Sequence, residues 1–148
     1  MFPYALLFHL ISLTIIAAGA IGSVVTFLAI RSALRAAPAA VPGIARMLPR
    51  FGMTAQIGAL LMLISGTLLL YSRGWADWGA PWLTAKLTLF ALLIVSSNVM
   101  IKPAGMKLGA AVATGAPTAP IVRRLSLIFV WQIAGFVTLI VLAVLGSR

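Results

Sequence analysis

Cysteine is absent from this chain, and acidic residues are almost absent, since Asp77 is the only one. Without cysteine there is no disulfide, no thiolate metal ligand and no thiol nucleophile. The chain also has a single histidine, His9, so no Ser-His-Asp or Cys-His set is available inside its apolar segments. These absences exclude a hydrolase of the soluble type.

Charge of either sign is scarce as well. Charged residues make up 8% of the 148 residues, whereas 63% are hydrophobic and the mean hydropathy is +1.17. Soluble domains use about 45–50% apolar residues, and a soluble domain of this size could not cover its surface with so few charges. The length indicates one domain, residues 1–148. The composition therefore predicts a single-domain integral membrane protein.

Four apolar runs are long enough to cross a bilayer, at about residues 4–30, 51–71, 82–101 and 125–146. A helix needs roughly 20 apolar residues to cross a hydrocarbon core about 30 Å thick. The runs are continuous rather than alternating, which favours helices over a β-barrel. No basic segment precedes the first run, so we interpret it as a retained helix rather than a signal peptide. The predicted fold is all-α, a bundle of four transmembrane helices.

Basic residues give this bundle an orientation. The net charge is +10, and the first and third connections hold Arg31, Arg35, Arg46, Arg50, Lys102, Lys107, Arg123 and Arg124. The second connection has only Arg73, near Asp77. The positive-inside rule then predicts that the first and third connections are cytoplasmic and that both termini are on the outer side. The expected location is the inner (cytoplasmic) membrane of a bacterium.

The basic residues also indicate a partner. They lie between long apolar runs, so we expect them to contact anionic lipid headgroups on the cytoplasmic side rather than nucleic acid. The two basic connections differ in composition. Residues 36–49 are interpreted as a bent interfacial segment, and residues 103–120, rich in glycine and proline, as a flexible linker at the membrane surface.

Small residues recur four apart in the first run, as Gly19 with Ser23 and Ala18 with Gly22. This spacing lets another helix backbone approach closely. We interpret it as packing inside the bundle, and the alternative is a face for a second copy or for another membrane subunit. A polar layer of Gln56, Asn98 and Gln132 lies near the inner helix ends, where its amides are predicted to hydrogen-bond across helices as structural contacts.

Two ionisable side chains, His9 and Lys86, lie inside the runs, where a charge costs about 2.5–3.5 kcal/mol on insertion scales. Each is about five residues from the outer end of its helix, roughly 6–8 Å below the outer interface. They therefore share a depth, and they share a pocket if the first and third helices are neighbours. Ser12 is one turn beyond His9 on a similar face, and Thr67 falls near the same level.

These residues admit two interpretations. In the first, the Lys86 ammonium reaches the interface along its apolar stem and His9 bonds a backbone carbonyl. In the second, His9 is an axial ligand to a haem or another tetrapyrrole, and Lys86 pairs with a propionate. With one histidine, the second axial position would need Lys86, a methionine such as Met62, water or nothing. A zinc or copper site would have too few ligands.

Two short stretches carry a resemblance. "LFHLISL" around His9 and "PWLTAKLTLFALL" around Lys86 resemble small four-helix bacterial membrane proteins of the HemJ-type protoporphyrinogen oxidase and CopD-like copper-resistance group. The resemblance implies a haem b site that uses a first-helix histidine and a third-helix lysine, which correspond to His9 and Lys86. The sequence departs from the HemJ pattern after Lys86, because "LTLFALLIVSSNVMIKPAG" has no histidine.

The expected function is therefore tetrapyrrole binding near the outer face, with Ser12 beside the ligand and a redox role following from the cofactor. The alternative is a non-catalytic accessory subunit of a larger membrane complex, motivated by the small-residue faces and the lack of an acid/base pair. A transporter is the least favoured class, because the only acid lies in a connection and no span is broken by an internal proline. No catalytic residue is assigned.

Overall fold

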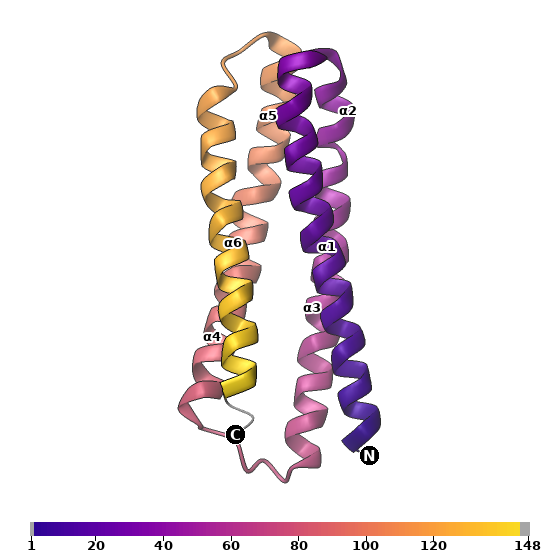
Figure 1. The fold of residues 1–148 in the computed structure, drawn as a ribbon, viewed down its shortest axis with the longest axis vertical. Coiled ribbons are helices and arrows are strands. Elements are labelled where there is room, and N and C mark those ends of the chain that lie inside the picture. Colours follow the sequence, from indigo (N-terminus) through magenta and orange to yellow (C-terminus); the bar gives the residue numbers. More distant parts are fainter. Residues whose placement is uncertain (1, 146–148) are drawn as a thin grey trace.

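The computed structural model describes residues 2–145, and within them every regular element is helical (Figure 1). In chain order the elements are α1 (Phe2–Ala36), η1 (Pro38–Ala40), α2 (Val41–Ala45), α3 (Met47–Ser72), α4 (Pro81–Ser96), η2 (Ser97–Ile101), α5 (Lys102–Thr114) and α6 (Ala119–Leu145). Four helical stretches are long and apolar enough to span a membrane: Pro3–Ala36, Pro38–Ser72, Pro81–Thr114 and Ala119–Val144. The predicted four-helix membrane fold is confirmed. The predicted end of the fourth span, Gly146, lies outside the described residues.

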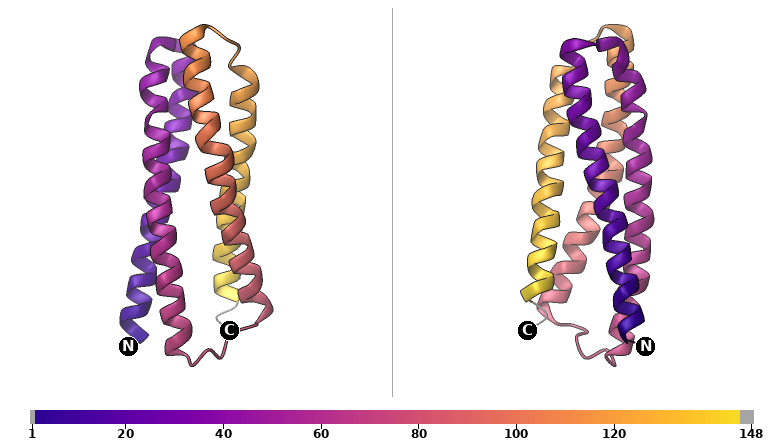
Figure 2. Two further views of the ribbon diagram at one scale, coloured as in Figure 1. Left: turned by 180° about the vertical axis from the view of Figure 1, so that it is seen from behind. Right: turned by 45° about the vertical axis from the view of Figure 1, so that its right-hand side comes forward.

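The helices form two hairpins that meet at one end and diverge towards the other. Helix α1 packs along α3, while α4 packs against α6. Figures 1 and 2 show the two hairpins close together where α2 and α5 lie, and apart where α1 begins and α6 ends. The described chain ends therefore lie at the divergent end, on one side of the bundle, as predicted. The positive-inside rule makes this the outer end, because the basic connections are at the other.

A compact apolar core holds the hairpins together at the convergent end. Its buried residues are Phe27, Ile30, Ala33, Val41, Ala45, Leu48, Ala104, Leu108, Leu125 and Phe129. The Phe27 and Phe129 rings join the two hairpins directly, with centroids 4.9 Å apart and planes inclined by 30°. Aromatic pairs in this distance range contribute about 0.5–1.5 kcal/mol beyond the area they bury. The core therefore acts as a clamp between the hairpins.

Glycines bring α1 and α3 close together. A Cβ atom at Gly19 would lie 2.5 Å from the Ala55 backbone nitrogen, and one at Gly58 would lie 2.7 Å from the Ile16 backbone nitrogen. Gly22 is covered in the same way by the Phe51 ring. The small-residue stripe thus serves packing inside the bundle, as interpreted from its spacing.

The third connection differs from the flexible linker expected at residues 103–120, because residues 102–114 form helix α5. The widened π turn η2 immediately precedes it. Proline inside a regular α-helix loses a hydrogen bond and clashes with the preceding turn, and a π turn relieves this locally. Pro103 therefore does not end the helix. Ala104, Gly105, Leu108 and Ala111 are buried, so packing against the core overrides the poor helix propensity of this stretch. Gly115, at φ 70°, ends the helix.

The first connection is also more ordered than an interfacial bend. It contains η1 and α2, and Val41 and Ala45 of α2 are buried in the core. The apolar patches of this segment thus face protein. The prolines of this segment are compatible with its short helices. Pro38 and Pro42 sit in the first turns, where their missing N–H groups cost nothing.

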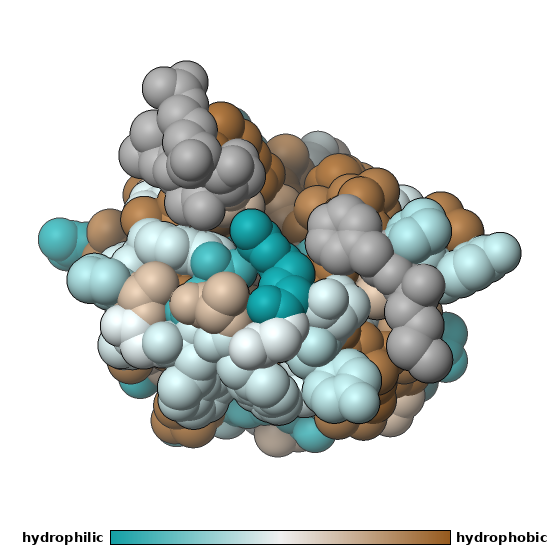
Figure 3. Space-filling model, turned by 90° about the horizontal axis from the view of Figure 1, so that it is seen from below, coloured by the Kyte–Doolittle hydropathy of each residue, from teal (hydrophilic) through white to brown (hydrophobic). Residues whose placement is uncertain are grey.

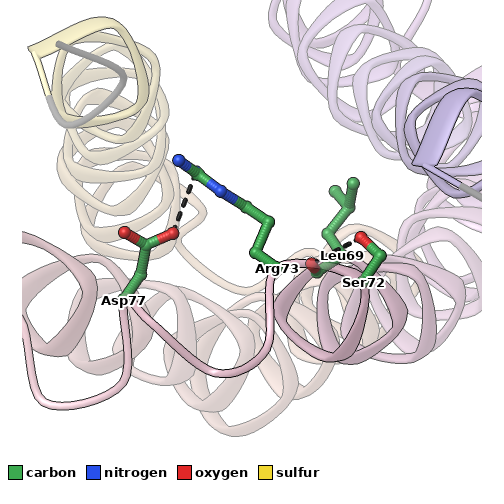
Figure 4. Close-up of polar contacts among 4 residues, drawn as sticks. All are labelled: Leu69, Ser72, Arg73 and Asp77. Atoms are coloured by element: carbon green, nitrogen blue, oxygen red, sulfur yellow. Dashed lines mark hydrogen bonds and ion pairs between the residues drawn. The ribbon is translucent and has the colours of Figure 1, made fainter.

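The outer end carries the connection between α3 and α4. Arg73 reaches from the end of α3 across the end of the bundle to Asp77, with 2.9 Å between its Nη1 and Oδ2 (Figure 4). Trp75 and Trp78 pack edge to face in the same connection, with ring centroids 5.7 Å apart. Figure 3 shows the face at this end as pale and teal, with brown apolar side chains around its flanks. This distribution is typical of a bundle end that meets a membrane surface.

Candidate functional site

His9 of α1 is hydrogen-bonded to α3 near the outer end. Its Nδ1 lies 2.9 Å from Oγ of Ser65, a fully buried side chain. The Ser65 hydroxyl in turn lies 3.1 Å from the Met62 carbonyl oxygen, which can only accept. Because a hydroxyl has one hydrogen, Ser65 donates to Met62 and accepts from His9 Nδ1–H. The neutral imidazole then keeps a free lone pair on Nε2, the state needed to ligate a metal.

Gly66, the next residue of α3, lies against the same ring. A Cβ at this position would be 3.6 Å from His9 Cε1, an ordinary van der Waals contact. The position has room for a methyl group, so the orientation of the His9 ring rests on its hydrogen bond with Ser65.

Lys86 comes from the other hairpin, on α4. It is half-buried and lies near enough to His9 for the two charges to interact. Within the described part of the chain its ammonium forms no hydrogen bond or ion pair. Helices α1 and α4 are not one of the tightly packed pairs, and their hairpins diverge towards this end (Figure 2). His9 and Lys86 therefore come from different hairpins.

The other two residues expected at this depth, Ser12 and Thr67, form hydrogen bonds within their own helices. Ser12 is fully buried, and its hydroxyl donates to the Phe8 carbonyl at 2.8 Å. Thr67 is exposed and donates to the Leu63 carbonyl at 2.9 Å. Neither contacts the His9 ring by a hydrogen bond. Ser12 is packed near His9 on α1, and its hydroxyl hydrogen is already used in the bond to Phe8.

The amide layer lies deeper and links the helices as predicted. Gln56 of α3 donates through Nε2 to Oδ1 of Asn98 in η2. Gln132 of α6 donates through Nε2 to the Leu93 carbonyl at 3.0 Å and to Ser96 Oγ at 2.8 Å. Such contacts between membrane helices average about 0.6 kcal/mol each. The layer joins the first hairpin to the second and both helices of the second to each other.

Among residues 2–145, no three histidine, cysteine or acidic side chains come together. The polar groups at the outer end suit a ligand that requires one imidazole and brings the rest of its coordination with it. A tetrapyrrole is such a ligand, since its ring supplies four nitrogens and the protein supplies axial positions.

Comparison with known proteins gives the family of the chain. The profile of the family described as "Predicted integral membrane protein (DUF2269)" matches residues 4–147. The chain belongs to this family. No curated protein and no solved structure matches it.

Membership in this family supports the coarser part of the resemblance carried by the two short stretches, a small integral membrane protein. The matching description is that of an integral membrane protein, and it supports neither the HemJ-type nor the CopD-like group. A stretch of seven to thirteen apolar residues is a weak marker of descent, because any transmembrane helix draws on the same few residue types. The haem site implied by the resemblance must therefore be argued from the contacts of His9.

Sequence reasoning did not connect Ser65 or Gly66 to the site. Ser65 is separated from His9 by 56 positions. A signal was present, since Ser65 is a hydroxyl in an apolar span and falls in the outer half of the bilayer, as His9 does. Depth alone could not select Ser65 over Thr67, because the choice depends on how α1 and α3 are rotated.

Proposed function

We propose that this member of the family binds haem b, or another tetrapyrrole, at the outer end of the bundle through Nε2 of His9. The observation that carries the proposal is the His9–Ser65 hydrogen bond, which leaves Nε2 as the free nitrogen. Ligating histidines characteristically donate their other N–H to a protein oxygen, which orients the ring and raises its basicity. A bound haem would supply one-electron redox chemistry at this end of the protein.

The surroundings of His9 fit such a group in charge and in shape. Lys86 is a half-buried cation without a partner among the described residues, and Arg73 lies at the same end, paired with Asp77. Either cation would bind a propionate. Gly66 lies beside the His9 ring and adds no side chain there. Ser12 would contribute by keeping this part of α1 packed against α3.

The accessory-subunit alternative loses its main motivation from the same structure. Gly19, Gly22 and Gly58 face residues of the neighbouring helix, so the close-packing surfaces are occupied within the chain. A second copy or another subunit would have to bind elsewhere on the lipid-facing surface.

The test is an absorption spectrum of the full chain, expressed with ample haem supply and purified in mild detergent, oxidised and then reduced with dithionite. We expect a Soret band that shifts on reduction, and we expect His9→Ala to abolish it. Ser65→Ala keeps the ligand and removes its hydrogen-bond partner, so haem affinity should fall by about 10–100-fold. Ser126→Ala is the matched control, because that hydroxyl bonds the Val122 carbonyl at the far end.

A Soret band of unchanged intensity in the His9→Ala protein would overturn the proposal. A flat visible spectrum in the wild-type protein after haem supplementation would do so as well, and would leave the accessory-subunit interpretation. Equal haem affinities of the Ser65→Ala and Ser126→Ala proteins would refute the assigned tautomer of His9.

A further inference from the structure

A cavity of about 420 Å³ lies between the hairpins at the level of the amide layer, deeper than His9. Helices α1, α3, α4 and α6 all contribute to its walls, together with η2. Its volume falls within the range of about 300–1,000 Å³ that is typical of small-molecule sites. Neither His9 nor Lys86 lines it, so the cavity is separate from the proposed tetrapyrrole site.

The lining determines the charge of an acceptable ligand. None of the lining side chains is ionisable, and the polar ones are serines and the amides Gln56, Asn98 and Gln132. A charged group buried in an apolar site without a partner is costly. The cavity therefore suits an uncharged molecule.

The hydrogen-bond network shows which amide atoms remain free. Asn98 donates through Nδ2 to the Ile94 carbonyl at 3.0 Å, so its Oδ1 is the acceptor that faces Gln56 Nε2. The Oε1 of Gln56 is then left without a partner in the described part of the chain. Gln132 is oriented in the same way, because both hydrogens of its Nε2 are used on Leu93 and Ser96. Each hairpin thus has one amide carbonyl oxygen without a partner in the described part of the chain, and the second hydrogens of Gln56 Nε2 and Asn98 Nδ2 also remain available as donors.

Aromatic rings and an apolar rim complete the cavity. Phe90, Phe129 and Phe136 are among its lining residues, and aromatic rings prefer to pack against other rings. Four apolar side chains at the edge of the cavity are at least half exposed: Ile21, Val25, Ile133 and Val137. In a membrane such side chains face lipid, so a ligand would reach the cavity from the acyl-chain region.

We infer that this cavity binds a lipid-soluble quinol, the dihydroxy form of a prenylated or alkylated ring. Such a molecule is uncharged, its ring packs among the phenylalanines, and its tail extends into lipid. Its two hydroxyl groups are donors, which matches the free Oε1 atoms of Gln56 and Gln132 on opposite hairpins.

The experiment measures retention of two probes by the full chain in mild detergent under anaerobic conditions: decylubiquinol and the dimethyl ether of decylubiquinol. The ether keeps the ring and tail but has no hydroxyl hydrogen. We expect the quinol to bind more tightly than the ether by about tenfold or more, the change expected from roughly one neutral hydrogen bond. Equal binding of quinol and ether by the wild-type protein would overturn the inference.

Location is tested with two tryptophan variants of the same helix. Ala20 lines the cavity, and Ala20→Trp would fill it, whereas Ala18 is exposed two residues away and does not line it. We expect Ala20→Trp to lower quinol affinity at least about tenfold, while Ala18→Trp binds as the wild type does. Equal affinities of the two tryptophan variants would place the quinol elsewhere and refute the assignment. Because His9 does not line the cavity, quinol binding is tested independently of the haem site.

Discussion

The packing of α1 on α3 predicts a specific cost for a single methyl group at Gly19. A Cβ there would lie 2.5 Å from the Ala55 nitrogen, 2.8 Å from the Ala55 Cβ and 2.8 Å from the Phe51 carbonyl oxygen. Two of these three atoms belong to the backbone, so rotation of a side chain cannot relieve the overlap. The two helices must instead move apart by roughly 1 Å along a closely packed interface. Overpacking of this kind costs about 1–3 kcal/mol.

Gly52 provides a matched control, because it lies within α3 and a Cβ there would meet nothing within 4 Å. Both substitutions replace a helical glycine by alanine, so both gain the same helix propensity of up to about 1 kcal/mol. The difference between the free energies of unfolding of the two variants therefore isolates the steric term. We expect Gly19→Ala to be less stable than Gly52→Ala by about 1–3 kcal/mol.

The assay is a titration with sodium dodecyl sulfate in mixed micelles, followed by the fluorescence of the four tryptophans. Gly58→Ala should behave as Gly19→Ala does, because its Cβ would lie 2.7 Å from the Ile16 nitrogen. If the Gly19 and Gly52 variants unfold within about 0.5 kcal/mol of each other, the range of ordinary surface substitutions, α1 and α3 are not packed as described.

Two further predictions concern the clamp and the orientation. Phe129→Ala should lower the free energy of unfolding by about 3–5 kcal/mol, because the ring is buried against Phe27. Val130 is the exposed neighbour, and Val130→Ala should have little effect in the same titration. Equal losses of unfolding free energy in the two variants would argue against the core at this end. Since the chain has no native cysteine, single variants report topology: in oriented membrane vesicles Ala76→Cys should react with an impermeant maleimide from the outer side and Gly43→Cys only from the cytoplasmic side. The reverse pattern would invert the bundle.

The helices themselves were predictable because they depend on local properties. A run of roughly 20 apolar residues must form a helix in lipid, since no water is present to satisfy its backbone groups. The span limits were less predictable, because α5 extends the third span to Thr114 through glycines and a proline. Burial of Leu108 and Ala111 against the core stabilises that extension, and burial is a property of the assembled bundle.

The candidate site was predictable in part. His9 and Lys86 stand out in the sequence because ionisable groups in a bilayer are costly, whatever the arrangement of helices. The partner of His9 did not stand out, because Ser65 and Thr67 are equally plausible by depth and only the rotation of α3 against α1 brings Ser65 to the ring. The cavity between the hairpins gave no sequence signal, since its walls come from all four spans.

The sequence alone thus determined that the chain crosses the membrane four times as helices, which end is basic, and which side chains are costly to bury. Each of these follows from residue type and position along one segment. The tertiary structure decided that α1 pairs with α3 and α4 with α6, that the hairpins join at the basic end and diverge at the other, and that His9 keeps Nε2 free. Those features depend on contacts between segments far apart in the chain, whose rotation and spacing are set by close packing around Gly19, Gly58 and the Phe27–Phe129 pair.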